Sequence, residues 1–298
     1  MKDGTAQGVA KARHYEALWD EARRLFFDPH AAEMYPGAFV QAWLGTTLTR
    51  RLYDLVGPGI LEMLLIRTKW LDDQVMSHAP SVEQMIIRGA GYDTRGFRLE
   101  LPREDFRVWE VDRPEVQRKK ISKIERIAKK DSTVSRLANT FVRFVPVDFN
   151  TDDLHEKLRE AEGFALARPS LVLLEGVTQY IPKSSTADTL RRLKSLVAPG
   201  STVLLSYVDQ DVFDEPSKVG PLRSVENLLK MSKKFGEPWI SAWTEPGFAA
   251  FMADLGFDVL ENSTARDYNE SYMVPLGRGM APEETTSVER FVVARLRG

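Results

Sequence analysis

The sequence predicts an α/β fold built on one mostly parallel sheet, and three observations indicate it. From residue 84 onward, short runs of β-branched and aromatic residues alternate with helical patterns. This alternation is typical of parallel strands joined by right-handed crossovers, with helices on both faces of the sheet. The run Leu-Val-Leu-Leu at 171–174 is apolar throughout, as expected of a strand buried on both faces. A glycine-rich turn at 89–91 follows the first apolar run, where open α/β sheets bind their ligands.

The predicted elements follow one another along the chain. An amphipathic helix over 8–27 opens a helical region, in which proline and glycine residues delimit two further helices over 38–56 and 60–79. Seven strands are expected at 84–88, 106–111, 141–147, 170–174, 202–208, 257–262 and 288–296. Further helices are expected at 114–130, 152–161, 184–197, 219–234 and 246–255.

We expect a single domain over residues 1–298, because no repeat, low-complexity tract or linker interrupts the chain. The regular alternation stops after Asp209, and a proline and two tryptophans follow near 238–243, so this stretch is predicted to be an insertion or lid. The expected parts are a helical N-terminal cap (1–80), a cofactor-binding core (84–209), a substrate lid (210–245) and the C-terminal part of the sheet (246–298).

Composition excludes several classes of protein. The chain has 41 Lys+Arg and 43 Asp+Glu residues, a net charge of −2, so nucleic acid is not the expected partner. The basic run at 118–130 contains the apolar stripe Ile121, Ile124 and Ile127, which indicates a helix that packs on the sheet and turns its charges to solvent. There is no cysteine, which excludes disulfides, thiolate metal sites and cysteine nucleophiles.

The sequence also sets expectations about metals and location. The four histidines contain no pair at ligand spacing, so we expect no metal site. No stretch approaches the roughly 20 apolar residues of a membrane span, and no signal peptide precedes the first helix. We therefore expect a cytoplasmic protein without a membrane partner.

The glycine turn and the strand after it form the most informative site. Gly89 and Gly91 leave the backbone open to a ligand, and Asp112 ends the next strand, where a carboxylate accepts both hydroxyls of a ribose. The dinucleotide fingerprint requires a third glycine, but this chain has Thr94 preceded by Asp93, whose charge would repel a pyrophosphate. S-adenosylmethionine is therefore favoured, and a nicotinamide-dependent oxidoreductase is the alternative from another class.

Several motifs in order resemble the leucine carboxyl methyltransferase family, which includes O-methyltransferases of polyketide pathways. They are Arg-Gly-Ala-Gly-Tyr-Asp-Thr-Arg at 88–95, Glu-Val-Asp-Arg-Pro at 110–114, Asp-Pro-His-Ala at 28–31, Arg-Thr-Lys-Trp-Leu-Asp-Asp at 67–73 and Glu-Gly-Val-Thr-Gln-Tyr at 175–180. The resemblance spans about residues 5–210. It implies a Rossmann-like class I methyltransferase fold, with a mostly parallel seven-stranded sheet and helices on both faces.

The resemblance also implies which residues bind S-adenosylmethionine. Arg67 would pair with the methionine carboxylate, and Glu175 would face the methionine amine. Because an unpaired buried acid is costly, Glu175 is expected to have a cationic partner. The other implied cofactor residues are Gly89 and Gly91 under the ligand, Asp112 at the ribose, and Asp148 and Phe149 at the adenine.

The acceptor side is less defined by the sequence. Arg13 matches a basic N-terminal position that closes over cofactor or substrate, and Tyr180 is a candidate for a substrate-facing catalytic residue. Arg88 stands where the family has an apolar residue, and we interpret it as recognising an anionic group of substrate or cofactor. Tyr207 and Trp243 would line an aromatic substrate pocket or belong to the core.

The expected activity is O-methylation of a carboxylate, phenol or alcohol of a small molecule. A carboxylate acceptor needs no base at neutral pH, whereas a hydroxyl needs one, for which His14, Tyr180 or a glutamate are candidates. A methyltransferase that modifies a protein C-terminal carboxyl or a tRNA would share every cofactor residue and is the alternative reading. The sequence does not define the oligomeric state.

Overall fold

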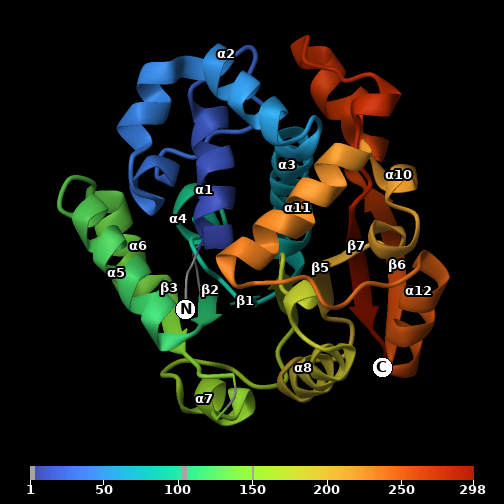
Figure 1. Ribbon diagram of the computed structural model, residues 1–298. Coiled ribbons are helices and arrows are strands. Elements are labelled where there is room, and N and C mark those ends of the chain that lie inside the picture. Colours follow the sequence, from blue (N-terminus) through green and yellow to red (C-terminus); the bar gives the residue numbers. More distant parts are fainter. Residues whose placement is uncertain (1–3, 103–105, 150) are drawn as a thin grey trace.

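The computed structural model describes residues 4–102, 106–149 and 151–298, and its centre is a seven-stranded sheet (Figure 1). The strand order is β3-β2-β1-β4-β5-β7-β6. Five strands are parallel: β1 (Gln84–Arg88), β2 (Arg107–Asp112), β3 (Val142–Pro146), β4 (Ser170–Leu174) and β5 (Thr202–Val208). The two others, β6 (Phe257–Thr264) and β7 (Glu289–Leu296), pair antiparallel, with β7 inserted beside β5. The predicted fold is confirmed.

Helices cover both faces of this sheet. Successive side chains of each strand point to opposite faces, so apolar residues on both faces need a helix to pack against. Ile87 of β1 belongs to a core shared with α3 (Ile60–His78), α5 (Pro114–Ala128) and α6 (Ser132–Thr140). Ile86, its neighbour, faces a second core shared with α7 (Leu154–Glu160), α8 (Lys183–Leu196) and α12 (Glu245–Asp254).

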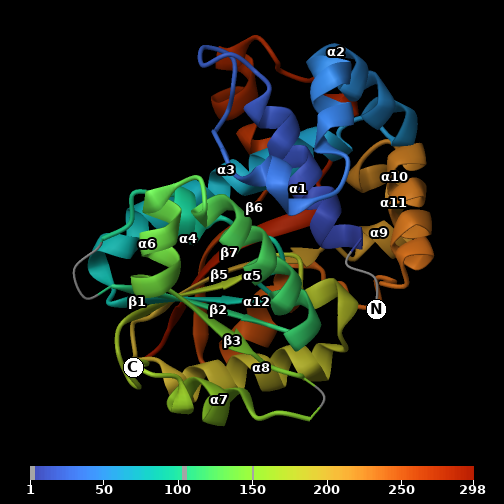
Figure 2. The ribbon, with the colours of Figure 1, turned by 90° about the vertical axis from the view of Figure 1, so that its left-hand side faces the viewer.

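The cap and the segment after β5 lie together at one end of the molecule (Figures 1 and 2). The cap consists of α1 (Gly4–Ala17), α2 (Ala38–Val56) and α3. The segment after β5 forms α9 (Asp211–Asp214), α10 (Pro216–Val219) and α11 (Leu222–Phe235), and α11 packs against α1 and α2. The remaining elements are α4 (Arg95–Arg98) and short 3₁₀ or π turns at 31–34, 79–81, 178–180, 265–276 and 282–284.

One helix prediction was wrong, and one helix was not predicted. The first helix ends at Ala17 rather than at residue 27, because the buried carboxylate of Glu16 accepts a hydrogen bond from the Leu25 backbone and pairs with Arg278, which turns the chain back. The helix α6 was missed. Its start is fixed by Asp131, whose side chain accepts hydrogen bonds from the first-turn N–H groups of Thr133 and Val134.

One basic residue of the run at 118–130 does not face solvent as predicted. Lys120 is 1% exposed and pairs with Glu110 of β2, which is fully buried. Burial raises the pKa of Glu110 to about 7, against the opposing effect of the Lys120 ammonium. The neighbouring Ile124 and Ile127 are buried, as the apolar stripe predicted.

Candidate functional site

The glycine turn follows β1 at the point where the strand order reverses between β1 and β4. Gly89 has a φ of 74° and Gly91 a φ of 45°, a left-handed conformation that favours glycine. A Cβ on Gly89 would lie 2.6 Å from Cγ2 of Val177. The N–H groups of Gly89 and Ala90 donate to the Val111 carbonyl, at 2.8 and 3.2 Å. The turn is therefore held against the end of β2 and requires glycine at its first position.

Asp112 lies at the end of β2 beside this turn, as predicted. Its Oδ2 accepts the Gly91 N–H at 2.6 Å, and its Oδ1 accepts the Arg113 N–H at 2.7 Å. Burial raises the pKa of Asp112, while both N–H groups oppose that rise. Because a carboxylate has about four acceptor positions, Asp112 is fixed in orientation and still able to accept hydrogen bonds from a ligand.

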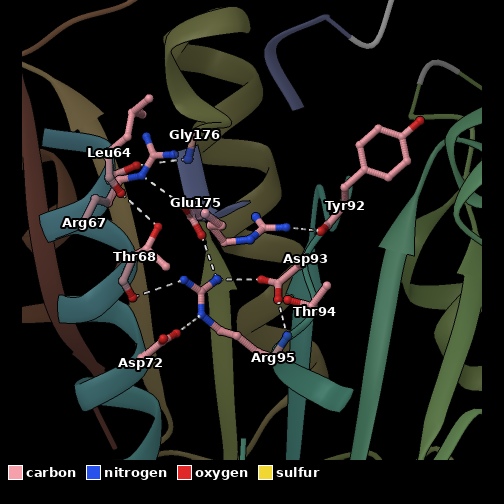
Figure 3. A network of polar contacts seen from close by, with 12 residues as sticks. Leu64, Arg67, Thr68, Asp72, Tyr92, Asp93, Thr94, Arg95, Glu175 and Gly176 are labelled. Atoms are coloured by element: carbon pink, nitrogen blue, oxygen red, sulfur yellow. Dashed lines mark hydrogen bonds and ion pairs between the residues drawn. The ribbon is translucent and has the colours of Figure 1, made fainter. Parts of the chain in front are cut away.

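A network of buried charges joins α3, the glycine turn and the end of β4 (Figure 3). Arg67 of α3 donates from Nε to Glu175 at 2.9 Å and from Nη1 to Glu289 at 2.5 Å. Burial would lower the pKa of Arg67, but the carboxylates of Glu289 and Glu175 raise it. Glu289 is oriented in turn by the Ser206 hydroxyl at 2.6 Å. Arg67 and Glu175, two of the predicted cofactor residues, are thus in direct contact.

Glu175 has the cationic partner that the sequence led us to expect, and in fact it has two. Its second oxygen accepts from Arg95 Nη1 at 2.7 Å, opposite the contact with Arg67. Burial alone would raise the pKa of Glu175, and the two guanidinium groups, Arg95 foremost, lower it. Glu175 is therefore an ionised carboxylate at neutral pH.

Arg95 is the site residue that sequence reasoning missed. It is 1% exposed and also pairs with Asp72 at 2.8 Å and Asp93 at 2.6 Å. These carboxylates raise its pKa despite full burial, and Arg95 in turn holds the pKa of Asp93 well below its usual range. The signal was present, because Arg95 closes the glycine motif and Asp72 belongs to the acidic pair of the preceding helix. Neither position was assigned a role.

Arg13 of α1 reaches over the glycine turn. Its Nε pairs with Asp28 at 2.8 Å, and its Nη2 donates to the Tyr92 carbonyl at 2.5 Å. Asp28 is buried and also accepts from the Thr94 hydroxyl at 2.7 Å. The pKa of Asp28 is lowered because Arg13 and Arg98 outweigh the effect of burial. The cap is thereby tied to the glycine motif.

Arg88 lies at the ribose end of the predicted site. Its guanidinium carbon is 4.2 Å from the ring centroid of Phe149, and the Asp112 carboxylate acts on its charge. Among the described residues its Nε has no hydrogen-bond partner, although the side chain is only 7% exposed. Burial lowers the pKa of Arg88 to about 10, so the group remains a cation at neutral pH.

The residues expected at the adenine follow β3. Phe149 packs against the core on the α7 side of the sheet, beneath Arg88. The Asp148 N–H donates to the Asp152 carboxylate at 2.9 Å, which fixes the backbone of this turn. The structure thus brings Phe149, Arg88 and Asp112 to neighbouring strand ends.

The aromatic residues considered for the acceptor divide into two groups. Tyr180 lies in the turn after Glu175, and burial raises its pKa. Tyr207 is fully buried, its ring stacked on Phe248 at 3.9 Å between centroids and meeting Trp243 edge-on at 6.1 Å. Tyr207 and Trp243 are therefore core residues, the second of the two roles that the sequence left open for them.

Two further findings concern metals and membranes. Within the described ranges, no group of three or more histidine or acidic side chains is placed to hold a metal ion. In the same part of the chain, every helix is too short or too polar to span a bilayer.

Comparison with known proteins places this arrangement among methyltransferases. The model of the leucine carboxyl methyltransferase family matches residues 6–194. A proposed S-adenosyl-L-methionine-dependent methyltransferase of Bacillus subtilis (strain 168) is 30% identical over 190 residues, 64% of this chain and 59% of that protein. The matched part is therefore about three fifths of that relative's length. A similarly named protein of Frankia alni is 29% identical over 279 residues, 91% of this chain and 87% of the relative.

Two crystal structures resemble the fold over nearly its whole length. One is a proposed methyltransferase of Thermobifida fusca YX, with a TM-score of 0.56 and 17% identity, covering 96% of this chain and 94% of the other. The second is a DUF574 family protein of Streptomyces avermitilis, with a TM-score of 0.57, 14% identity and 96% of each chain covered. At such identities the likeness concerns the fold alone.

Proposed function

This chain belongs to the leucine carboxyl methyltransferase family, so S-adenosylmethionine is its cofactor, and we propose that it methylates an oxygen atom of a small molecule. The cofactor part of the proposal rests on the placement of carboxylates on both sides of the glycine turn. Asp112 ends β2 on one side of the turn, and the Arg67–Glu175 pair lies at the end of β4 on the other. Ligands of open α/β sheets bind in this crevice.

The donor set of the site fits the cofactor. Asp112 would accept the two ribose hydroxyls, and Phe149 with the turn around Asp148 would hold the adenine. Glu175, ionised because of its guanidinium partners, would accept hydrogen bonds from the methionine amine. Arg67 engages its carboxylate partners through Nε and Nη1, and its fork carries further N–H groups for the methionine carboxylate. When bound, the cofactor supplies a methyl group on a cationic sulfur.

The remaining task of the chain is to align the acceptor and exclude water, which favours a reaction in which charge is lost. Arg13, held by Asp28 and the Tyr92 carbonyl, would keep the cap closed over the glycine turn. Tyr180 would face the acceptor from the turn after Glu175. For a carboxylate acceptor no base is required, because it is ionised at neutral pH.

A hydroxyl acceptor would need a base, and His14 is the candidate best supported by its surroundings. Burial lowers the pKa of His14, so its imidazole is neutral at pH 7. Its Nδ1 is 2.6 Å from the Tyr35 hydroxyl, which in turn donates to Gln41. The two acceptor types therefore predict different pH profiles of activity. His14→Gln should abolish methyl transfer to a hydroxyl acceptor and leave transfer to a carboxylate acceptor in place.

Arg88 is proposed to act on the cofactor side, because it lies beside Asp112 and Phe149. Its guanidinium would hold the Phe149 ring and offer its Nε–H to the adenosine. Arg88→Leu should then weaken S-adenosylhomocysteine binding and leave the acceptor KM unchanged. A raised acceptor KM with unchanged cofactor affinity would instead assign Arg88 to an anionic acceptor.

The test of the function is transfer of a labelled methyl group from S-adenosylmethionine to panels of small carboxylic acids, phenols and alcohols. Base treatment distinguishes the products, because a methyl ester releases methanol and an ether does not. Asp112→Ala should abolish transfer, whereas Asp188→Ala, an exposed carboxylate of α8, should not affect it. Transfer to tRNA or to a protein C-terminus, with none to small molecules, would overturn the proposed acceptor class.

A further inference from the structure

Helix α2 presents its apolar side to solvent. Of its described residues, those that are buried are polar: Gln41 at 5% and Thr49 at 4% exposure. Trp43 is 83% exposed and Phe39 77%. A surface helix ordinarily shows the opposite arrangement, with the apolar stripe against the core. This inversion indicates that the outer side of α2 is made to contact something other than water.

We call the exposed large apolar residues of α2 the α2 face. It consists of six large apolar residues, Phe39, Val40, Trp43, Leu48, Leu52 and Leu55. Gly45, with non-helical angles of 65° and −174°, bends the helix between the aromatic and the leucine parts. Figures 1 and 2 both show α2 at the periphery of the molecule. Contiguous exposed patches of large apolar side chains mark sites of interaction with proteins or membranes.

The α2 face continues onto α11, which is attached to the end of α2. Arg223 donates to the Leu55 carbonyl at 2.5 Å, and Asn227 donates to the Val56 carbonyl. Between the two helices lies an open groove of about 320 Å³, lined by Leu55, Met231 and the lysines 230 and 234 among others. The two helices therefore present a single surface.

The charges on these two helices are predominantly positive. In α2 and α11, whose residues are all described, the exposed cations are Arg51, Arg223, Lys230, Lys233 and Lys234. The anions there are Glu226, which pairs with Lys230 at 3.2 Å, and the partly exposed Asp54, which lies 3.6 Å from Arg50. The whole chain, by contrast, has a net charge of −2. The cations are therefore concentrated around the α2 face.

We propose that the α2 face, with the cations of α11, docks on the surface of an anionic lipid bilayer. Tryptophan, phenylalanine and leucine on one side with lysine and arginine beside them are the composition of helices that lie in a membrane interface. Each basic residue near an anionic bilayer adds electrostatic attraction to the surface. A second copy docked through the same face would bring its cations against those of the first, which is unfavourable.

This mode of binding differs from the spanning of a membrane, which the sequence excludes. The expectation of no membrane partner rested on the absence of a run long enough to span a bilayer. An interfacial helix needs no such run, because only its apolar side enters the headgroup region. The proposal does not depend on the acceptor or on the chemistry at the glycine turn.

The test is co-sedimentation of the full chain with vesicles of phosphatidylcholine alone or mixed with phosphatidylglycerol, at low and high salt. We expect binding to the anionic vesicles that weakens with salt, because exposed charges are screened. The double variants Phe39→Ser/Trp43→Ser and Lys230→Glu/Lys234→Glu should each lower the partition coefficient at least tenfold. Unchanged S-adenosylhomocysteine affinity of the variants would show that they remain folded.

Matched controls alter similar side chains elsewhere. Leu260→Ser removes another half-exposed apolar residue, and Lys129→Glu/Lys130→Glu reverses two exposed charges at the end of α5. Both should bind anionic vesicles like the wild type. Failure of the wild type to bind, or equal binding by the α2 variants, would overturn the proposal. So would a dimer seen by sedimentation without lipid and lost in Phe39→Ser/Trp43→Ser, which would assign the face to a second copy.

Discussion

The consecutive helices α2 and α3 are both 19 residues long, yet α2 exposes its largest apolar side chains, whereas α3 buries most of its own. α3 buries its apolar side, including Leu65, Ile66 and Trp70, and also carries Arg67 and Asp72 into the charge network. α2 buries Gln41 and Thr49 and exposes tryptophan and phenylalanine. An amphipathic pattern therefore predicts a helix, but it does not predict which side of that helix faces the protein. The neighbours of the helix decide that.

The largest expected difference concerns one tryptophan in each helix. Trp70 of α3 is 1% exposed and donates to Glu261 at 2.8 Å, whereas Trp43 of α2 is 83% exposed. Trp70→Ala should lower the free energy of unfolding by about 3–5 kcal/mol, because it leaves a cavity. Trp43→Ala should change it by less than about 0.5 kcal/mol. Urea unfolding measures both changes in the free energy of unfolding. Similar changes for the two variants would contradict the expected difference between the two helices.

A second contrast concerns one aspartate in each helix. Asp72 pairs with Arg95 and Arg98, all three buried, while Asp54 of α2 is half exposed and lies 3.6 Å from Arg50. Asp72→Ala should destabilise the chain by about 3 kcal/mol, since breaking a buried pair leaves charges without compensation. Asp54→Ala should cost at most about 1 kcal/mol. A loss below 1 kcal/mol for Asp72→Ala would mean that the network does not stabilise the fold.

The network also predicts a loss of stability in acid. The pKa values of Asp28, Asp93 and Glu175 are all below their usual range, because guanidinium groups outweigh burial. Their contribution is complete above the unfolded-state pKa of about 4. Below it the unfolded chain binds protons first, so stability falls as the pH decreases towards the folded-state values. Thermal unfolding between pH 5 and pH 3, the range in which these three carboxylates act, should show a Tm that decreases with pH; a Tm that increases over this range would contradict this account.

The smallest effect is expected on the buried side of α2. The Thr49 hydroxyl is buried without a hydrogen-bond partner among the described residues. Thr49→Val should stabilise the protein by about 1 kcal/mol, because it removes an unsatisfied polar group at nearly constant volume. The control is Thr189→Val in α8, whose hydroxyl donates to the Ser185 carbonyl at 2.9 Å and which should gain nothing. Destabilisation by Thr49→Val would show that this hydroxyl has a partner after all.

The sheet was largely predictable because each strand is a short apolar run bounded by turn residues. The boundaries agree to within two residues for all seven strands, and 84–88, 170–174 and 202–208 agree in full. Helices with weaker apolar patterns were less predictable. α6 has the sequence Ser-Thr-Val-Ser-Arg-Leu-Ala-Asn-Thr, with two buried apolar residues, so its start depends on the Asp131 cap more than on periodicity.

The site was predictable where motifs mark strand ends and less so where partners are distant in sequence. Gly89, Gly91 and Asp112 meet as expected because β1 and β2 are adjacent parallel strands. Arg95 joins Asp72, Asp93 and Glu175 from three separate elements, and no spacing rule indicates that convergence. The sequence did not decide between a pocket and the core for Tyr207 and Trp243. Both rings pack against Phe248 of α12, which is distant in sequence from Tyr207, and this contact assigns them to the core.

If the crevice at Asp112 binds S-adenosylmethionine, calorimetric titration with S-adenosylhomocysteine should show it. We expect micromolar binding by the wild type and by Asp188→Ala, no binding of NADH, and an affinity about 10–100-fold weaker in Asp112→Ala. That loss corresponds to about 1.5–3 kcal/mol for hydrogen bonds to a charged acceptor. Binding that survives Asp112→Ala unchanged, or binding of NADH in place of S-adenosylhomocysteine, would contradict the account.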